Sequence, residues 1–301
     1  MRQNYKFTIS YDGTRYQGWE RQPSTDMTIQ GKLEAVLSRM AASADTDAAS
    51  NIKTAEVRSI KTEEGTDAVE ENPAVIRKKY NESEDVANKE EIPAAERRIE
   101  VIGAGRTDAG VHARSMIANA FMDVRMGPDE IRDYMNRYLP DDICIKEVKI
   151  ASDRFHSRYN ATGKTYRYTC FTGPIKPVFD RKYVYYMDET PDIDRMKRAA
   201  ELLKGEHDYK SFCSNPRMKK STVRKVDRID IAMKGSYITF TYHGTGFLQY
   251  MVRIMTGTLL EVGLGKRDPE SMTELLEAKD RRIAGATAPA MGLTMISVDY
   301  A

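Results

Sequence analysis

The sequence predicts an α+β fold of two related halves, and three observations support this. Stretches of alternating apolar and polar residues, such as Tyr5–Tyr11, are typical of strands buried on one side. Other segments repeat apolar residues at helical spacing. The predicted order is βαββαβ over residues 1–153, as in a ferredoxin-like unit, and ββαββααβ over residues 154–301. We therefore predict two domains with these bounds, a mixed sheet with helices on one side, and a cleft between the halves.

The elements of the first half follow from local signals. Tyr5–Tyr11 is a strand that ends at the turn Asp12-Gly13-Thr14. Thr28 can cap the next helix, and Pro128 opens another. The first of these helices has an apolar face of Ile29, Leu33, Val36, Leu37 and Met40. The remaining strands are predicted over 99–102, 116–122 and 143–150.

The second half is predicted in the same way. Helices are expected over 191–203, 247–262 and 268–279. Gly205 ends the first of these helices. Strands are expected over 164–171, 182–187, 226–232, 237–242 and 295–298. The pair around Lys234-Gly235-Ser236 forms a hairpin.

Charge is unevenly distributed along the chain. Residues 41–96 hold 14 acidic and 7 basic residues, a net charge of −7, so the other 245 residues carry 40 basic against 31 acidic residues, a net of +9. A basic body favours a polyanionic partner such as nucleic acid, although a solvated surface would look the same. Residues 41–96 have Tyr80 as their one aromatic residue, and we interpret them as an acidic low-complexity insertion.

Composition limits the remaining possibilities. The three cysteines, Cys144, Cys170 and Cys213, are far apart and form no CxxC or Cys/His cluster, so we expect no structural zinc and a reducing compartment. We find neither an apolar signal region nor a run of about 18 apolar residues. These observations predict a cytoplasmic protein that does not span a membrane.

The segment Gly105–Ala113 is the strongest candidate for chemistry. It places Asp108 in a short loop between glycines, directly after a β-branched run. A carboxylate there can act as nucleophile, general base or metal ligand, or can simply stabilise a turn. A dinucleotide fingerprint would need glycine at position 108, and no GxSxG elbow accompanies His156-Ser157.

Basic and aromatic residues are interleaved elsewhere. Residues 154–159, 164–168 and 209–225 mix cations with rings, a pattern that can hold phosphates and stack on unpaired bases. A strand with Tyr and Arg in alternation can also bury the rings and expose the cations. For Tyr168 we favour this core position.

Several motifs together resemble the tRNA pseudouridine synthase A family. GRTDAGVHA at residues 105–113 is similar to its hallmark, and residues 11–19 to its N-terminal signature. Residues 155–158 and 164–168 resemble its central segment. Residues 247–263 resemble its late helix, and 278–293 its C-terminal segment. The similarity covers nearly the whole chain apart from residues 41–96.

The resemblance implies a cofactor-free isomerase of tRNA. Members convert uridine to pseudouridine at three neighbouring positions of the anticodon stem-loop, 38, 39 and 40, and act as homodimers. The implied fold is a mostly antiparallel sheet built from two similar halves that flank the active-site cleft. No metal, membrane or small-molecule cofactor is implied.

The resemblance also assigns roles to residues. Asp108 matches the nucleophile, Arg253 the arginine paired with it, and Tyr166 the ring that stacks on the target base and relays a proton. Arg106 resembles the residue that fills the space of the flipped base or holds phosphate. We assign His112, Arg158, Lys164 and Leu293 to substrate binding, with Leu293 in the apolar wall of the pocket.

Two departures from the family pattern stand out. Glu20 occupies a position where the family often has Gln, which puts an RNA contact there in doubt. The acidic insertion would repel tRNA, so we expect it to point away from the cleft. An RNA-binding protein without catalysis and an isomerase of ribosomal RNA are the alternatives, but the acid, arginine and tyrosine are all present.

Overall fold

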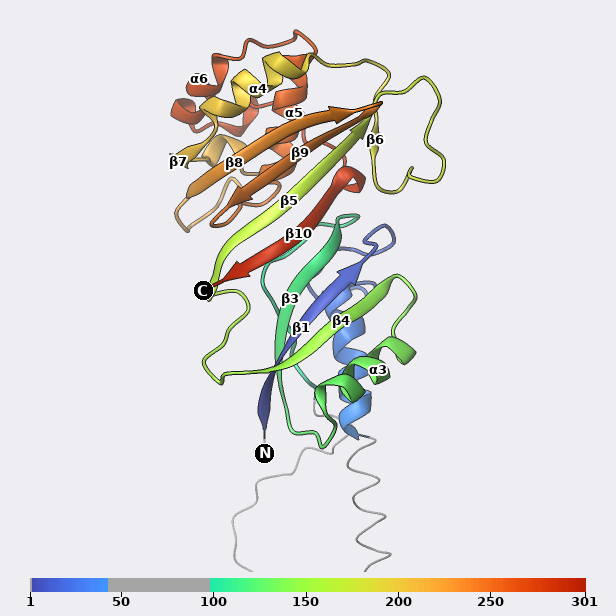
Figure 1. Cartoon of the computed structure of the whole chain (residues 1–301). Helices are drawn as coiled ribbons and strands as arrows, with labels where there is room; N and C mark the ends of the chain where they lie inside the picture. The colour runs from blue at the N-terminus through green and yellow to red at the C-terminus, as the bar shows by residue number, and fades with distance from the viewer. Residues whose placement is uncertain (1, 43–97) are drawn as a thin grey trace, which may run out of the picture. The chain divides into compact units, whose positions relative to one another are not determined.

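The computed structural model describes residues 2–42 and 98–301. Residues 1–36 and 99–301 form one compact unit built on a single ten-stranded sheet with the order β4-β1-β3-β10-β5-β9-β8-β7 (Figure 1). Strand β2 adds to β3, and β6 adds to β5. Two of these pairings, β10 with β3 and β5 with β6, are parallel and the others antiparallel. The predicted α+β class with a mixed, mostly antiparallel sheet is confirmed.

The first half supplies one end of the sheet. Its elements are β1 (Gln3–Tyr11), a helix over residues 29–42, β2 (Ile102–Gly103), β3 (His112–Met122), α3 (Pro128–Tyr138) and β4 (Ile143–Ala151). The amide of Gly31 donates to Thr28 Oγ1 at 3.2 Å, which is the predicted cap. Glu130 accepts from the Gly127 amide at 2.7 Å and closes the start of α3.

The second half supplies the other end. Its strands are β5 (Ala161–Phe171), β6 (Tyr185–Tyr186), β7 (Gly205–Asp208), β8 (Val223–Lys234), β9 (Tyr237–Gly244) and β10 (Leu293–Tyr300). Its helices are α4 (Ile193–Leu202), α5 (Met251–Gly263) and α6 (Ser271–Ala278), with short 3₁₀ turns at Lys210–Phe212, Arg281–Ile283 and Ala290–Gly292. The division into two domains at residue 153 stays a prediction.

Several element bounds differ from those predicted. The strand expected over 182–187 shrinks to β6, because Tyr183 turns away to donate to Asp12 Oδ2 at 3.1 Å. The helix expected from Phe247 begins at Met251, because Tyr250 adopts a left-handed backbone with φ of 61°. Strand β7 was not predicted, since Glu206, His207 and Asp208 show no apolar alternation.

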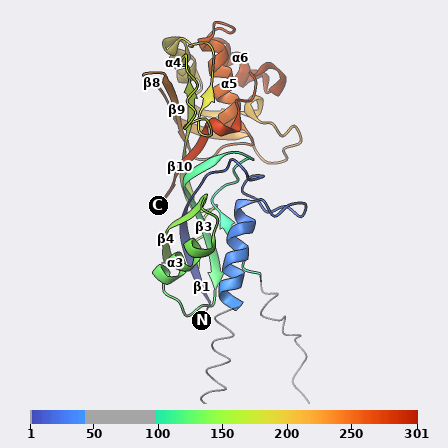
Figure 2. The same ribbon diagram turned by 90° about the vertical axis from the view of Figure 1, so that its right-hand side faces the viewer.

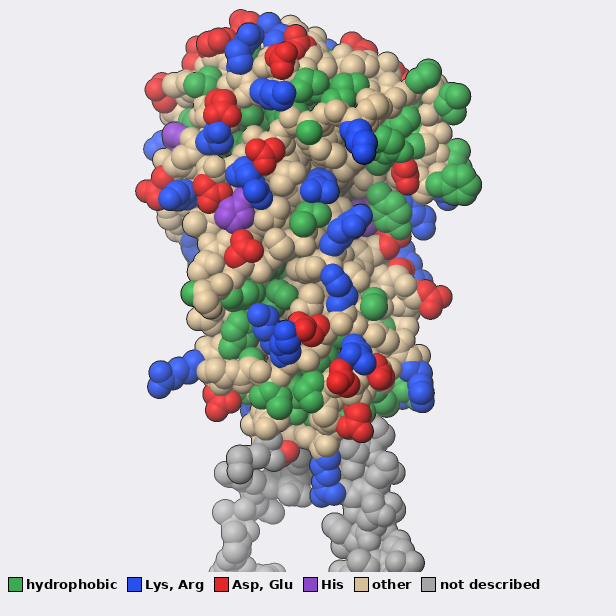
Figure 3. Space-filling view, viewed as in Figure 1, with side chains coloured by type: hydrophobic (Ala, Val, Ile, Leu, Met, Phe, Trp, Pro, Cys, Tyr) green, Lys and Arg blue, Asp and Glu red, His purple; other side chains and the backbone are tan. Residues whose placement is uncertain are grey.

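One face of the sheet carries the core. Tyr5, Phe7 and Ile9 of β1 are buried on that face, as are Tyr168 of β5 and Phe240 of β9. Helix α5 and the 29–42 helix lie behind the sheet in Figure 1 and to its right in Figure 2. Figure 3 shows the other, open face, where basic side chains lie among acidic ones. Helices on one side therefore leave the other side free, as predicted.

The predicted acidic insertion, residues 41–96, lies outside the described residues apart from positions 41 and 42. Among the described residues, no helix is both long enough and apolar enough to cross a membrane.

Candidate active site

The loop that carries Asp108 connects β2 to β3 and is fixed by a second loop. The Trp19 amide donates to Thr107 O at 3.0 Å, and the Gly110 amide donates to Tyr16 O at 3.3 Å. Gly18 lies between these contacts with φ of +97°, and a Cβ there would come within 2.7 Å of Thr107 O. Only glycine combines a favourable positive φ with the absence of a Cβ that would clash with Thr107 O. The backbone around Asp108 is therefore held by main-chain contacts on both sides.

Asp108 forms an ion pair with an arginine from the other half of the chain. Arg253 lies in the first turn of α5, and its Nη1 lies 3.2 Å from Asp108 Oδ2. Arg253 Nε also donates to Ala288 O at 2.8 Å, and its guanidinium lies 4.8 Å from the centre of the Tyr250 ring. Burial raises the pKa of the Asp108 carboxyl, and Arg253 opposes that shift.

Tyr166 of β5 is buried next to this pair. Its ring meets Phe247 edge-on, with centroids 5.2 Å apart and planes at 84°. Burial raises the pKa of its phenol, and the charge of Asp108 adds to the effect, so Tyr166 stays protonated at neutral pH. A protonated phenol can donate a hydrogen bond.

A cleft of about 730 Å³ joins these residues, with walls from both halves. The predicted residues Arg106, Arg158, Lys164 and Leu293 line it together with Asp108, Tyr166 and Arg253. The described lining contains six cationic side chains, Arg106, Arg158, Lys164, Lys220, Arg224 and Arg253, and two carboxylates, Asp108 and Glu20. The predicted cleft between the halves is confirmed, and its charge favours an anionic ligand.

Lys164 lies in the cleft lining and has a lowered pKa. Its Nζ donates to the backbone oxygen of Ala104 at 2.8 Å, four residues before Asp108. Burial lowers the pKa of Lys164 to about 8, and the charges of Arg158 and Arg224 contribute to this shift. The ammonium is thus poised to gain from an anion placed beside it.

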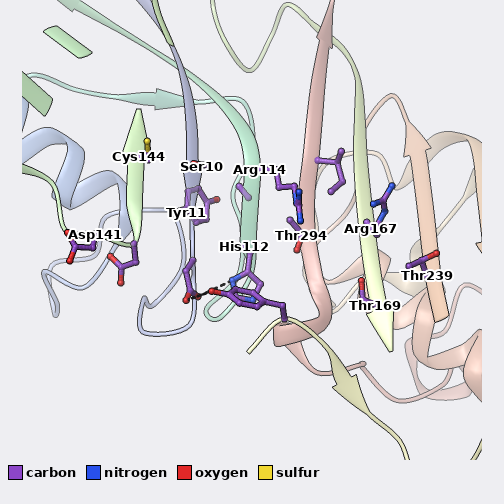
Figure 4. Close-up of a pocket in the computed structure, with 15 residues that line it drawn as sticks. Ser10, Tyr11, His112, Arg114, Asp141, Cys144, Arg167, Thr169, Thr239 and Thr294 are labelled. Atoms are coloured by element: carbon purple, nitrogen blue, oxygen red, sulfur yellow. Dashed lines mark hydrogen bonds and ion pairs between the residues drawn. The ribbon is translucent and has the colours of Figure 1, made fainter. Parts of the chain in front are cut away.

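The structure places His112 away from the cleft. At the start of β3, it lines a separate hollow of about 460 Å³ that also contains Arg114 and Arg167 (Figure 4). Its Nδ1 accepts from the Gly13 amide at 3.0 Å, and its Nε2 lies 3.2 Å from Met291 O. Burial lowers its pKa, which favours the neutral ring. These contacts make His112 a structural link, and its role in substrate binding stays a prediction.

Two aromatic residues in the cleft received no role from the sequence. Phe247 packs on Tyr166, and Tyr250 packs on Arg253 while adopting a left-handed backbone. A non-glycine residue in that conformation is uncommon and is held by its surroundings. The sequence contained one signal for the contact between Tyr250 and Arg253, because residues three positions apart near a helix start lie side by side.

Within residues 2–42 and 98–301, no group of three or more His, Cys, Asp or Glu side chains has an arrangement that could hold a metal ion.

The fold and this site define the class of protein. A family model described as tRNA pseudouridine synthase matches residues 8–160 and 199–301, and the chain belongs to that family. Pseudouridine synthases are isomerases, so the chain is an enzyme of this class.

Individual relatives agree. The chain is 37% identical over 297 residues to "tRNA pseudouridine synthase A" of Bacillus sp. (strain KSM-64), with 99% of each chain covered. It is 36% identical over 297 residues to the protein of that name from Clostridium kluyveri, again with 99% of each covered. It is 35% identical over 300 residues to that of Geobacillus sp. (strain WCH70), covering 100% of this chain and 99% of the relative. The resemblance to the tRNA pseudouridine synthase A family is confirmed.

Proposed function

We propose that the protein isomerises uridine to pseudouridine in the anticodon stem-loop of tRNA, with Asp108 as the catalytic nucleophile. The observation that carries this proposal is the Asp108–Arg253 pair beside Tyr166, inside a cleft that is otherwise basic. The names of the relatives support tRNA as the substrate. The anticodon stem-loop and positions 38 to 40 rest on the family resemblance.

The reaction breaks the bond from N1 to C1′ and forms one from C5 to C1′. C5 loses a proton and N1 gains one, so the product is an isomer and no electrons are exchanged. Asp108 can add to the sugar carbon or to the base, or remove a sugar proton, and each role requires its ionised form. Arg253 supports that form against the effect of burial. Tyr166 stacks on the target base and its phenol relays the C5 proton, a role that its position in the cleft lining near Asp108 supports.

Access to the uridine requires the base to leave its stack, at a cost of a few kcal/mol. The cations Arg158, Lys164 and Arg224 line the cleft and can bind phosphates to offset this cost. Leu293, 5% exposed, supplies an apolar wall for the base.

We propose that the enzyme acts as a homodimer in the cytoplasm. Ile175, Val178 and Phe179, in the loop between β5 and β6, are 81%, 61% and 95% exposed, which supports association through that loop. The described cysteines are all free, as suits a reducing compartment. Analytical ultracentrifugation of the wild type and of Phe179→Ser tests the dimer, and a monomeric wild type at assay concentration would contradict it.

Tritium release tests the reaction. tRNA labelled with tritium at uridine C5 should lose label with the wild-type protein and keep it with Asp108→Ala. Sequencing of the product then locates pseudouridine. If no tRNA releases label with the wild type, the proposed activity is wrong, and if only ribosomal RNA does, the substrate is wrong.

A further inference from the structure

Glu20 is an unexpected residue in a cleft that binds a polyanion. Of the two carboxylates in the described lining, Asp108 is paired with Arg253 and belongs to the proposed chemistry. Glu20 is paired with Arg106, whose Nη2 contacts its Oε1. A carboxylate near RNA phosphates costs affinity unless its position serves another purpose.

Glu20 is held on a rigid base. Trp19, directly before it, is 3% exposed, and its ring lies so close to Gly103 that a Cβ there would approach to 2.5 Å. Its main chain is bonded on both sides, through the Trp19 amide to Thr107 O and from the Gln30 amide to Trp19 O. The backbone from which the Glu20 side chain reaches Arg106 is therefore fixed in place.

Arg106 is the movable partner. Its side chain is 60% exposed and that of Glu20 is 47% exposed. Among the described residues, no other carboxylate is paired with Arg106. A carboxylate oxygen thus occupies the place on the guanidinium that a phosphate oxygen would take, since both anions match the same fork of donors.

We infer that Glu20 is a positioning residue that holds Arg106 at the cleft until an RNA phosphate displaces it. This inference rests on the proposed function and adds the ligand exchange at Arg106. Breaking the Glu20–Arg106 pair costs part of the free energy that the phosphate contact supplies. The pair is broken in the complex, so Glu20 lowers affinity and leaves the chemical step unchanged.

The test compares Glu20→Gln with a matched control. Glu147→Gln also removes one negative charge from an exposed pair, because Glu147 is 49% exposed and lies 2.6 Å from Lys149, but it lies outside the cleft. Kd for an unmodified tRNA transcript is measured by filter binding across a salt series, and kcat and KM by tritium release. Both substitutions are also made in an Arg106→Ala background, with melting temperatures recorded.

We expect Glu20→Gln to lower Kd and KM about two- to fivefold at constant kcat. The slope of log K against log salt concentration should stay unchanged, because both proteins neutralise the same number of phosphates. Glu147→Gln should leave Kd and KM unchanged, and Glu20→Gln should have no effect on them once Arg106 is gone.

Three results would overturn the inference: unchanged affinity, a lower kcat, or the same gain in affinity without Arg106, which would make Glu20 a simple repelling charge. A wild type that binds tRNA without releasing tritium would contradict the proposed function alone, because the binding series still tests Glu20.

Discussion

Arg253 Nη1 lies 3.2 Å from Asp108 Oδ2, although 145 positions separate the two residues in the sequence. The cation comes from α5 in the second half, and the carboxylate from the loop after β2 in the first. The charge state of the proposed nucleophile therefore depends on a residue contributed by the other side of the cleft.

Replacing Arg253 by Gln should shift the pH dependence of catalysis. Burial already raises the pKa of Asp108, and loss of the opposing cation raises it further. The ionised, active form exists above that pKa, so the acidic limb of the rate profile should move to higher pH. Turnover near pH 7 should fall about tenfold or more, as for a lost charged hydrogen bond of about 1.5–3 kcal/mol.

Tritium release between pH 4.5 and 8 measures both effects of the Arg253 change. Arg253→Lys serves as the control, since it keeps a charge and should preserve more of the acidic limb than Arg253→Gln. Identical acidic limbs for the wild type and Arg253→Gln would show that the pair does not tune Asp108.

Lys164 should make tRNA binding depend on pH. Its pKa of about 8 means that the ammonium is present at pH 7 and is lost as the pH rises through 8. We expect affinity to fall about fivefold from pH 7 to pH 9, equivalent to about 1 kcal/mol for one phosphate contact. Filter binding at constant ionic strength measures this. Lys164→Arg stays charged over this range, so its tRNA affinity should depend less on pH. An equally steep fall in that variant would show that a group other than Lys164 causes the pH dependence.

Gly18→Ala should damage both stability and catalysis. The residue adopts φ of +97°, and the new Cβ would meet Thr107 O at 2.7 Å, next to Asp108. We expect a loss of about 1–3 kcal/mol in the free energy of unfolding, together with slower tritium release. Gly235→Ala is the matched control, because it has φ of +58° but no atom within 4 Å of the added Cβ. If urea denaturation gives equal losses for both variants, contact with the Asp108 loop is unimportant.

His243 should stabilise the fold mainly below neutral pH. Burial lowers its pKa, but hydrogen bonds with Asp227 at 2.5 Å and Asp299 at 2.9 Å outweigh this and raise it above the usual value. A raised folded-state pKa contributes stability that is complete below the unfolded pKa and is lost as the pH rises through the folded one. Because the three side chains are 25%, 42% and 48% exposed, the contribution is at most about 1 kcal/mol.

Thermal denaturation of His243→Gln tests this expectation. The melting temperature should drop more, relative to the wild type, at pH 5.5 than at pH 8.5. An equal drop at both values would mean that packing, and not the charge, is lost.

Local patterns were sufficient for much of the fold. Alternation in Tyr5–Tyr11 identified β1, and the cap at Thr28 marked the start of the next helix. The short extent of β6 depends on the hydrogen bond of Tyr183 with the distant Asp12, and the start of α5 depends on the left-handed backbone of Tyr250. The periodicity of apolar residues indicates neither feature.

In the candidate site, too, local sequence identified single residues but not the contacts between distant ones. Asp108 could be singled out from its loop, but its pairing with Arg253 came only from family resemblance, because nothing in the spacing of the two residues brings them together. His112 is near Asp108 in sequence, yet the strand that starts there directs it into a different hollow. The contact of Glu20 with Arg106 joins residues of two loops and needed the structure.

Strand β10 joins the two halves, pairing in parallel with β3 through Thr294 and Met295 and antiparallel with β5 along most of its length. Residues 293–300 are thus at the centre of the sheet, while their neighbours are made more than a hundred residues earlier. During translation, β3 and β5 must wait with open edges until the ribosome has released this segment. The cleft, which Leu293 of this strand helps to line, can therefore be complete only after residues 293–300 have been made.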